Sequence, residues 1–127
     1  MDRLDGEASR PRLLLVDDEE RILSALRRSL RREGYEILVA GSVAQALEIL
    51  SRQPIDLILS DHMMPGMTGV ELLAEAQRQQ PEAVRMLISG WSQTVSLEEL
   101  ESLGVKQVIS KPWDDAELKQ TLRQALA

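Results

Sequence analysis

The chain has 127 residues, of which 43% are hydrophobic and none is cysteine, and its formal net charge is -6. This size and composition suit one domain with a core of its own. The absence of cysteine excludes disulfides and favours a reducing compartment, so we expect a cytoplasmic protein. The negative charge argues against direct nucleic-acid binding. No apolar run approaches the roughly 20 residues that span a membrane, so no membrane contact is expected.

The first segment, residues 1–11, is polar and shows no periodic apolar pattern. We expect it to be a flexible leader before a domain that spans residues 12–127. Within that domain, four arginines gather at Arg27, Arg28, Arg31 and Arg32. In an acidic chain such a cluster is best interpreted as the solvated face of an amphipathic helix.

Hydrophobic patterning in the domain alternates between two periods. Continuous apolar runs indicate buried strands, and apolar residues at helical spacing indicate amphipathic helices. The predicted strands are residues 12–16, 35–40, 56–60, 83–89 and 105–110. Each strand is followed by a predicted helix, and these helices are residues 19–34, 42–53, 70–79, 92–104 and 114–127. Ser42 is expected to cap the second helix, and Gly34 to end the first.

Strands that alternate with helices in this way imply right-handed crossovers and a parallel sheet covered on both faces. The predicted fold class is α/β, a flavodoxin-like doubly wound five-stranded parallel sheet with strand order 2-1-3-4-5. In that order the winding direction switches between the first and third strands. Ligands bind beyond the carboxyl ends of the strands at such a switch point, which directs attention to the residues that follow these strands.

Three aspartates are predicted to meet at this edge, because Asp17 and Asp18 follow the first strand and Asp61 follows the third. Considered alone, Asp17 and Asp18 are better explained as helix-capping residues. Capping does not explain an aspartate at the end of a second central strand. Clustered carboxylates raise one another's pKa unless a cation neutralises them, and oxygen ligands favour a hard ion such as Mg²⁺.

Ser89 and Lys111 end the fourth and fifth strands, which brings a hydroxyl and an ammonium to the same edge. Each has an ordinary interpretation, as a turn residue and as a solvated lysine. Together with the acids they make up the set that phosphoryl transfer requires. A metal and an ammonium offset charge on the transferred oxygens, while a carboxylate can act as the nucleophile.

The segment after Asp61 is rich in glycine and methionine. Gly66 and Gly69 mark a loop that can bring the backbone close to a ligand. His62, the only histidine, is expected at a surface or wall position, because alternation along the strand points it away from Asp61. The methionines are interpreted as packing residues and not as metal ligands.

These motifs, VDDE, DHMMPGMTG, ISG and KP, resemble in their order and spacing the receiver domains of two-component response regulators, over essentially all of residues 12–126. The resemblance implies that Asp61 is the phosphoacceptor. It also implies that Asp18 binds Mg²⁺ directly, that Asp17 assists partly through water, and that the Met63 backbone carbonyl completes the metal site.

By the same resemblance, Ser89 hydrogen-bonds the phosphoryl group, Lys111 pairs with it, and the Lys111–Pro112 peptide bond is cis. The phosphoryl donor would be a histidine kinase. The chain would then be no enzyme in the ordinary sense, because it would catalyse only its own phosphorylation and dephosphorylation.

The resemblance also implies an output face made of the fourth helix, the fifth strand and the fifth helix, and including Leu118 and Leu122. This face would bind an output domain or protein, or form a homodimer. The KPW motif resembles receivers joined to cyclic-di-nucleotide phosphodiesterase or other signalling domains. Val108 departs from the family pattern, which often has Tyr or Phe at that position.

Two further positions, Met63 and Trp91, are ones that affect the lifetime of the phosphorylated state in the family. Trp91 either covers the phosphoryl group or serves as a packing residue. Two alternative functions stay open. One is a phosphorylation-independent interaction module of the same fold. The other is a phosphohydrolase that resembles haloacid dehalogenases, although those usually carry an acid where this chain has Met63.

Overall fold

Ten elements alternate along the chain in a computed structural model, which describes residues 10–64, 66–90, 95–105 and 107–127. In order they are β1 Arg12–Val16, α1 Glu20–Leu30, β2 Glu36–Ala40, α2 Val43–Arg52, β3 Leu57–Asp61, α3 Gly69–Gln79, β4 Val84–Gly90, α4 Leu97–Ser102, β5 Val108–Lys111 and α5 Asp115–Leu126. These elements confirm the five predicted strand and helix pairs. Most of the expected leader lies outside the described residues.

The fifth strand begins later than predicted, at Val108. Val105 was expected to start it, but its backbone N–H donates to Leu100 O at 2.9 Å and so belongs to the turn that ends α4. The Val105 side chain is buried in the core beside that helix. Its apolar character therefore reflects helix packing, which periodicity alone does not separate from a strand.

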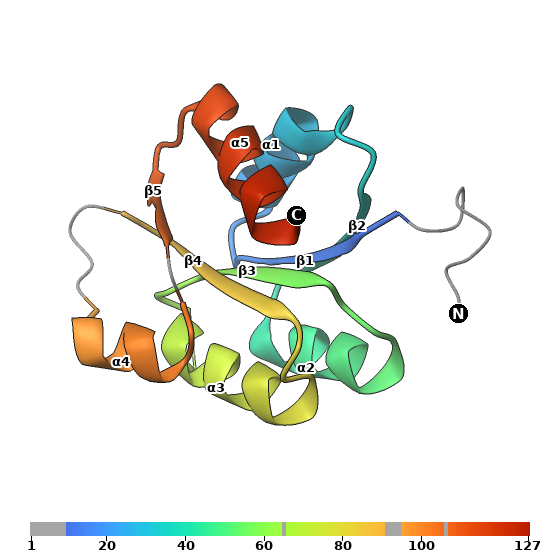
Figure 1. Ribbon diagram of the computed structural model, residues 1–127. Helices are drawn as coiled ribbons and strands as arrows, with labels where there is room; N and C mark the ends of the chain where they lie inside the picture. The colour runs from blue at the N-terminus through green and yellow to red at the C-terminus, as the bar shows by residue number, and fades with distance from the viewer. Residues whose placement is uncertain (1–9, 65, 91–94, 106) are drawn as a thin grey trace.

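The five strands form one parallel sheet in the order β2-β1-β3-β4-β5, which confirms the predicted flavodoxin-like topology. Figure 1 shows α1 and α5 on one face of the sheet, and α2, α3 and α4 on the other. The central strand β3 is buried along its whole length. Among the described residues, no helix has the length and apolar character needed to cross a bilayer.

Side chains alternate along β1 and so divide the core in two. Leu14 packs into the cluster beneath α2, α3 and α4, whereas Leu13 packs beneath α1 and α5. Leu118 and Leu122 of α5 belong to this second cluster and are 1% and 0% exposed. The prediction that they form part of an output face is therefore wrong. They lie four residues apart on the helix stripe that faces the sheet.

Gln80 joins the ends of two helices to the loop before β3. Its Nε2 donates to the carbonyls of Leu50 (2.8 Å) and Gln53 (2.9 Å), and its Oε1 accepts from the Ile55 N–H (2.8 Å). One partly buried amide thus satisfies three backbone groups where α2 ends. This contact helps to fix where β3 starts, and hence where its carboxyl end lies.

Replacing Gln80 with alanine is expected to lower the free energy of unfolding by about 1–3 kcal/mol, because the three backbone groups lose their partner. Urea denaturation followed by circular dichroism measures this change. Gln79→Ala is the matched control, since Gln79 is exposed and its side-chain amide donates to the neighbouring Glu75 carboxylate. The effect of this control should stay within about 0.5 kcal/mol. Equal losses in the two variants would contradict the role of Gln80.

Candidate functional site

The three predicted aspartates meet at the carboxyl edge of the sheet. Val16 pairs with Ser60 in the parallel register, so the next residues, Asp17 and Asp61, lie side by side. Oxygen atoms of Asp17, Asp18 and Asp61 all lie within 4.8 Å of one another. Asp17 is fully buried and Asp61 is 3% exposed, whereas Asp18 is exposed. The cluster therefore has a buried part and an opening to solvent.

Lys111 links the two buried acids. Its Nζ lies 2.8 Å from Asp17 Oδ2 and 3.0 Å from Asp61 Oδ1. The lysine comes from the end of β5 and reaches past β4, so three strands contribute to this contact. The following Lys111–Pro112 bond is cis, as the resemblance implied.

The pKa values of Asp61 and Lys111 are both raised above their ordinary values. Burial raises the pKa of the Asp61 carboxyl; the Lys111 hydrogen bond opposes this shift, and the Asp17 charge adds to it. For Lys111, burial alone would lower the pKa, but the hydrogen bonds to Asp17 and Asp61, together with the negative charges of these two acids, outweigh burial and raise the pKa. The ammonium thus stays protonated between the two acids.

The charges at this edge do not balance. Three carboxylates face a single ammonium, so an ionised cluster carries excess negative charge. Asp18 makes no hydrogen bond or ion pair within the described ranges of the chain. An all-oxygen donor set with one exposed carboxylate fits a hard divalent cation such as Mg²⁺, which keeps several water ligands.

Asp17 also supports the backbone that leads into α1. Its Oδ1 accepts from the Glu19 N–H at 2.9 Å, and its own N–H donates to Ala40 O at 3.2 Å. The capping interpretation is therefore wrong for this residue, because the N-cap of α1 is Glu19 and the helix has no side-chain cap hydrogen bond. Asp17 instead stabilises the turn before the helix and takes part in the aspartate cluster. Its Oδ1 accepts from the turn before α1, and its Oδ2 accepts from Lys111.

Ser89 lies at the end of β4, one residue beyond Ile88, which pairs with Asp61. It is 6% exposed, and its hydroxyl donates to Gly90 O at 3.1 Å. The Ser89 hydroxyl can give up this carbonyl and donate to another acceptor instead. Met63 is 55% exposed, and the metal-binding role of its carbonyl stays a prediction. Trp91 lies outside the described residues.

His62 is partly exposed, in agreement with a wall position. Its Nδ1 is buried and has no hydrogen-bond partner within the part of the chain that the structure describes. A neutral imidazole with its proton on Nε2 would leave Nδ1 as an unpaired acceptor. The side chain is therefore more enclosed than a surface residue.

The glycine that matters most to the site has a role that the sequence interpretation missed. Gly69 donates its N–H to His62 O at 2.6 Å. A Cβ at this position would collide with Asp61 O and would lie 2.9 Å from His62 Cα. Gly69 thus packs against the backbone that carries the central aspartate. Thr68 and Glu71 form a capping box that fixes the helix start at this contact.

Comparison with known sequences identifies the family. The sequence model of the response regulator receiver domain matches residues 13–123. The chain is 43% identical over 115 residues to the hydrogenase transcriptional regulatory protein HoxA of Cupriavidus necator, covering 90% of this chain and 24% of that protein. It is 35% identical over 114 residues to the transcriptional regulatory protein GlrR of Escherichia coli K12, with 90% and 26% covered. The chain spans about a quarter of the length of these relatives.

Solved structures agree with the sequence comparison. The signal receiver domain of an HD domain-containing protein from Pseudomonas fluorescens Pf-5 superposes with a TM-score of 0.83 and 37% identity, over 92% of this chain and 94% of that one. A CheY-like receiver domain protein from Methanospirillum hungatei JF-1 gives a TM-score of 0.84 at 30% identity, over 93% and 94%.

Gly69→Ala is expected to lower the free energy of unfolding by about 1–3 kcal/mol, because the added methyl group has no space beside the Asp61 backbone. Chemical denaturation measures the loss. Gly41→Ala is the matched control, since a Cβ at Gly41 would meet only Gln45 Oε1 at an ordinary 3.6 Å. If Gly69→Ala leaves the free energy of unfolding unchanged, the loop before α3 can move away from β3 without cost, and the proposed close packing is contradicted.

Proposed function

This chain belongs to the response regulator receiver domain family, and we propose that it accepts a phosphoryl group from a histidine kinase on Asp61 with Mg²⁺ bound. Proteins of this family receive phosphoryl groups from histidine kinases and act on output domains, and their receiver domains bind Mg²⁺ at an acidic pocket. The observation that carries the proposal is the Lys111 ammonium held between Asp17 and Asp61, beside the exposed Asp18.

The metal would be held directly by the carboxylates of Asp18 and Asp61 and by the Met63 carbonyl, with Asp17 assisting partly through water. When bound, Mg²⁺ offsets negative charge on the acids and on the oxygens of the incoming phosphoryl group. The donor set supports this assignment because Asp18 is exposed, while the oxygens of Asp17 are already engaged by Glu19 and Lys111.

Asp61 acts as the nucleophile in this mechanism. One carboxylate oxygen attacks phosphorus, and an O–P bond forms as the bond from phosphorus to the donor histidine nitrogen breaks. The nitrogen leaves with the electron pair of that bond. Burial of Asp61 keeps competing water away from the nucleophile, and Lys111 holds its Oδ1 in position.

The added group then draws nearby donors toward itself. A phosphoryl group brings about -1.5 to -2 charges and strong acceptor oxygens. Lys111 can exchange its contact with Asp61 Oδ1 for a phosphoryl oxygen, and the Ser89 hydroxyl can exchange its contact with Gly90 O. Both residues end strands, β4 and β5, so the rearrangement would favour one of two pre-existing conformations at that side of the sheet.

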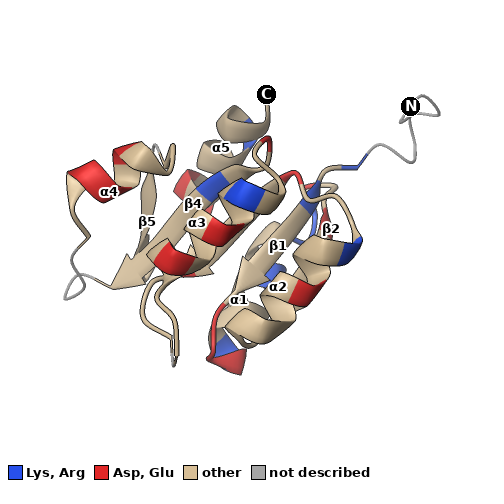
Figure 2. Cartoon of the chain, turned by 90° about the horizontal axis from the view of Figure 1, so that it is seen from below, with Lys and Arg blue, Asp and Glu red and all other residues tan. Residues whose placement is uncertain are grey.

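The output would be controlled through α4, β5 and α5. Leu97 is 78% exposed and Val108 is 42% exposed, and both line a hollow of about 730 Å³ between α4 and β5. Figure 2 shows acidic and no basic residues on α4. These exposed residues, in place of Leu118 and Leu122, support an output surface that contacts another domain, a partner protein or a second copy of this chain.

Incubation with acetyl phosphate and Mg²⁺ is expected to add the mass of one phosphoryl group, and Asp61→Asn is expected to remove this adduct. Intact-mass spectrometry measures it. Asp56→Asn is the matched control, because Asp56 directly precedes β3, at the end opposite Asp61, and its carboxylate accepts from the Arg12 N–H at 2.7 Å. That variant should still be modified.

An adduct that forms without Mg²⁺ or persists in Asp61→Asn would contradict the assignment of the nucleophile. If neither acetyl phosphate modifies the wild type nor beryllofluoride binds it in the presence of Mg²⁺, the phosphorylation-independent interaction module becomes the better interpretation.

Ser89→Ala is expected to slow phosphorylation by acetyl phosphate roughly 10²-fold, the lower end of the loss when one oxyanion donor is removed. Ser110→Ala is the control, since Ser110 is exposed and pairs with Ser89 on the neighbouring strand. The rate of adduct formation, followed by intact-mass spectrometry, is compared between the two variants. A similar rate in the two variants would mean that Ser89 does not contact the transferred group.

A further inference from the structure

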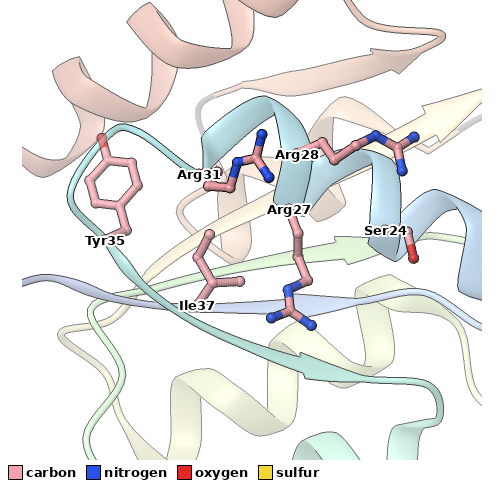
Figure 3. Close-up of a pocket in the computed structure, with 6 residues that line it drawn as sticks. All are labelled: Ser24, Arg27, Arg28, Arg31, Tyr35 and Ile37. Carbon is pink, nitrogen blue, oxygen red and sulfur yellow. The ribbon is translucent and has the colours of Figure 1, made fainter.

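A second polar site lies near the opposite edge of the sheet, between α1 and β2. Its pocket of about 440 Å³ is lined by Ser24, Arg27, Arg28, Arg31, Tyr35 and Ile37. Ile37 pairs with Leu13 at the start of β1, whereas Asp17 follows the end of β1. Figure 3 shows Arg27 and Arg28 on α1 and Arg31 directly after it, with Tyr35 on the chain that enters β2 and Ile37 in β2. The pocket is therefore separate from the aspartate cluster.

The arginines of this pocket have no acidic partner among the described residues. Arg27, Arg28 and Arg31 are exposed and make no ion pair within the described ranges. The acids nearest in sequence are engaged elsewhere, because Glu33 binds Arg123 at 2.8 Å and Glu36 binds Arg12 at 3.1 Å. Uncompensated positive charge is concentrated here in a chain whose net charge is -6.

The spacing of these residues makes the cluster unfavourable without an external anion. Arg27 and Arg31 lie four residues apart at the end of α1, and Arg28 and Arg31 three apart, a spacing at which like charges repel one another. Figure 3 shows the three guanidinium groups turned in different directions. The negative end of the helix dipole offsets part of this repulsion, but it amounts to only about half an elementary charge. Three guanidinium groups exceed what the helix end can balance.

We propose that this pocket binds a small anion that carries several phosphate charges, such as an inorganic or nucleoside polyphosphate. Guanidinium groups bind phosphate oxygens in a bidentate manner, and the Ser24 hydroxyl at one end of the pocket is a further donor. Tyr35 and Ile37 provide an apolar wall. The volume lies within the range of small-ligand sites, about 300–1,000 Å³. The net charge disfavours a long nucleic acid, which the rest of the surface would repel.

The test is a titration of the protein with sodium triphosphate, and separately with ATP, in low salt with EDTA to remove divalent ions. Tyr35 is the only tyrosine in the chain, so tyrosine ring proton NMR signals report on this pocket alone. We expect saturable shifts of these signals, and weaker binding as salt increases. Equal affinities for triphosphate and ATP would mean that the phosphate chain alone accounts for binding. Tighter binding of ATP would mean that the apolar wall contacts the base. Both results support the site.

Arg27→Gln with Arg31→Gln is expected to raise the triphosphate Kd at least tenfold. The matched control is Arg21→Gln with Arg32→Gln, which removes the same charge from exposed residues outside the pocket lining. Its Kd should change less than threefold. The titration is repeated on Asp61→Asn, which should bind as the wild type does, so the result does not depend on the proposed phosphoacceptor chemistry.

Four results would overturn the proposal. They are an absence of saturable shifts in the wild type, an equal loss of affinity in the two double variants, a loss of binding in Asp61→Asn, and binding of a single-stranded oligonucleotide without binding of triphosphate.

Discussion

One ammonium shared by two buried carboxylates holds the functional edge of the sheet together. Lys111 joins Asp17 after β1 and Asp61 at the end of β3 from its own place on β5. Breaking a buried ion pair by removing one partner costs about 3–5 kcal/mol, because the remaining charge is left uncompensated. The strand order and the packing of β3 therefore serve to bring three charged side chains from distant parts of the chain into contact.

The same contact makes the site responsive. Lys111 lies at similar distances, 2.8 and 3.0 Å, from the two acids, so neither partner holds it exclusively. New negative charge on Asp61 would change this balance directly at the end of β5. The supporting contacts do not share this freedom, because Gly69 is packed against the Asp61 backbone and Gln80 fixes the start of the strand. A rigid β3 strand, with a Lys111 ammonium at its end that can change partners, suits a conformational switch.

The sequence predicted the strand order and the meeting of Asp17, Asp61 and Lys111, because residues at the carboxyl ends of parallel strands share one edge. It did not predict the contacts of Gly69 and Gln80, since these depend on how loops approach the backbone in three dimensions. The orientation of α5 was also missed. An apolar stripe reveals that Leu118 and Leu122 lie on one helix face, but not that the sheet covers this face.

Helix α1 connects the two polar regions of the molecule. Its entry turn is held by the Asp17 carboxylate, and its last turn carries the arginines of the second pocket. The helix has 11 residues and is therefore about 16 Å long, which exceeds the screening length of about 8 Å at physiological ionic strength. Direct charge interaction between its ends is thus weak. Movement of α1, which rests on the sheet through Leu23, Leu26 and Leu30, is therefore one route by which an anion at the arginines would influence the aspartate cluster.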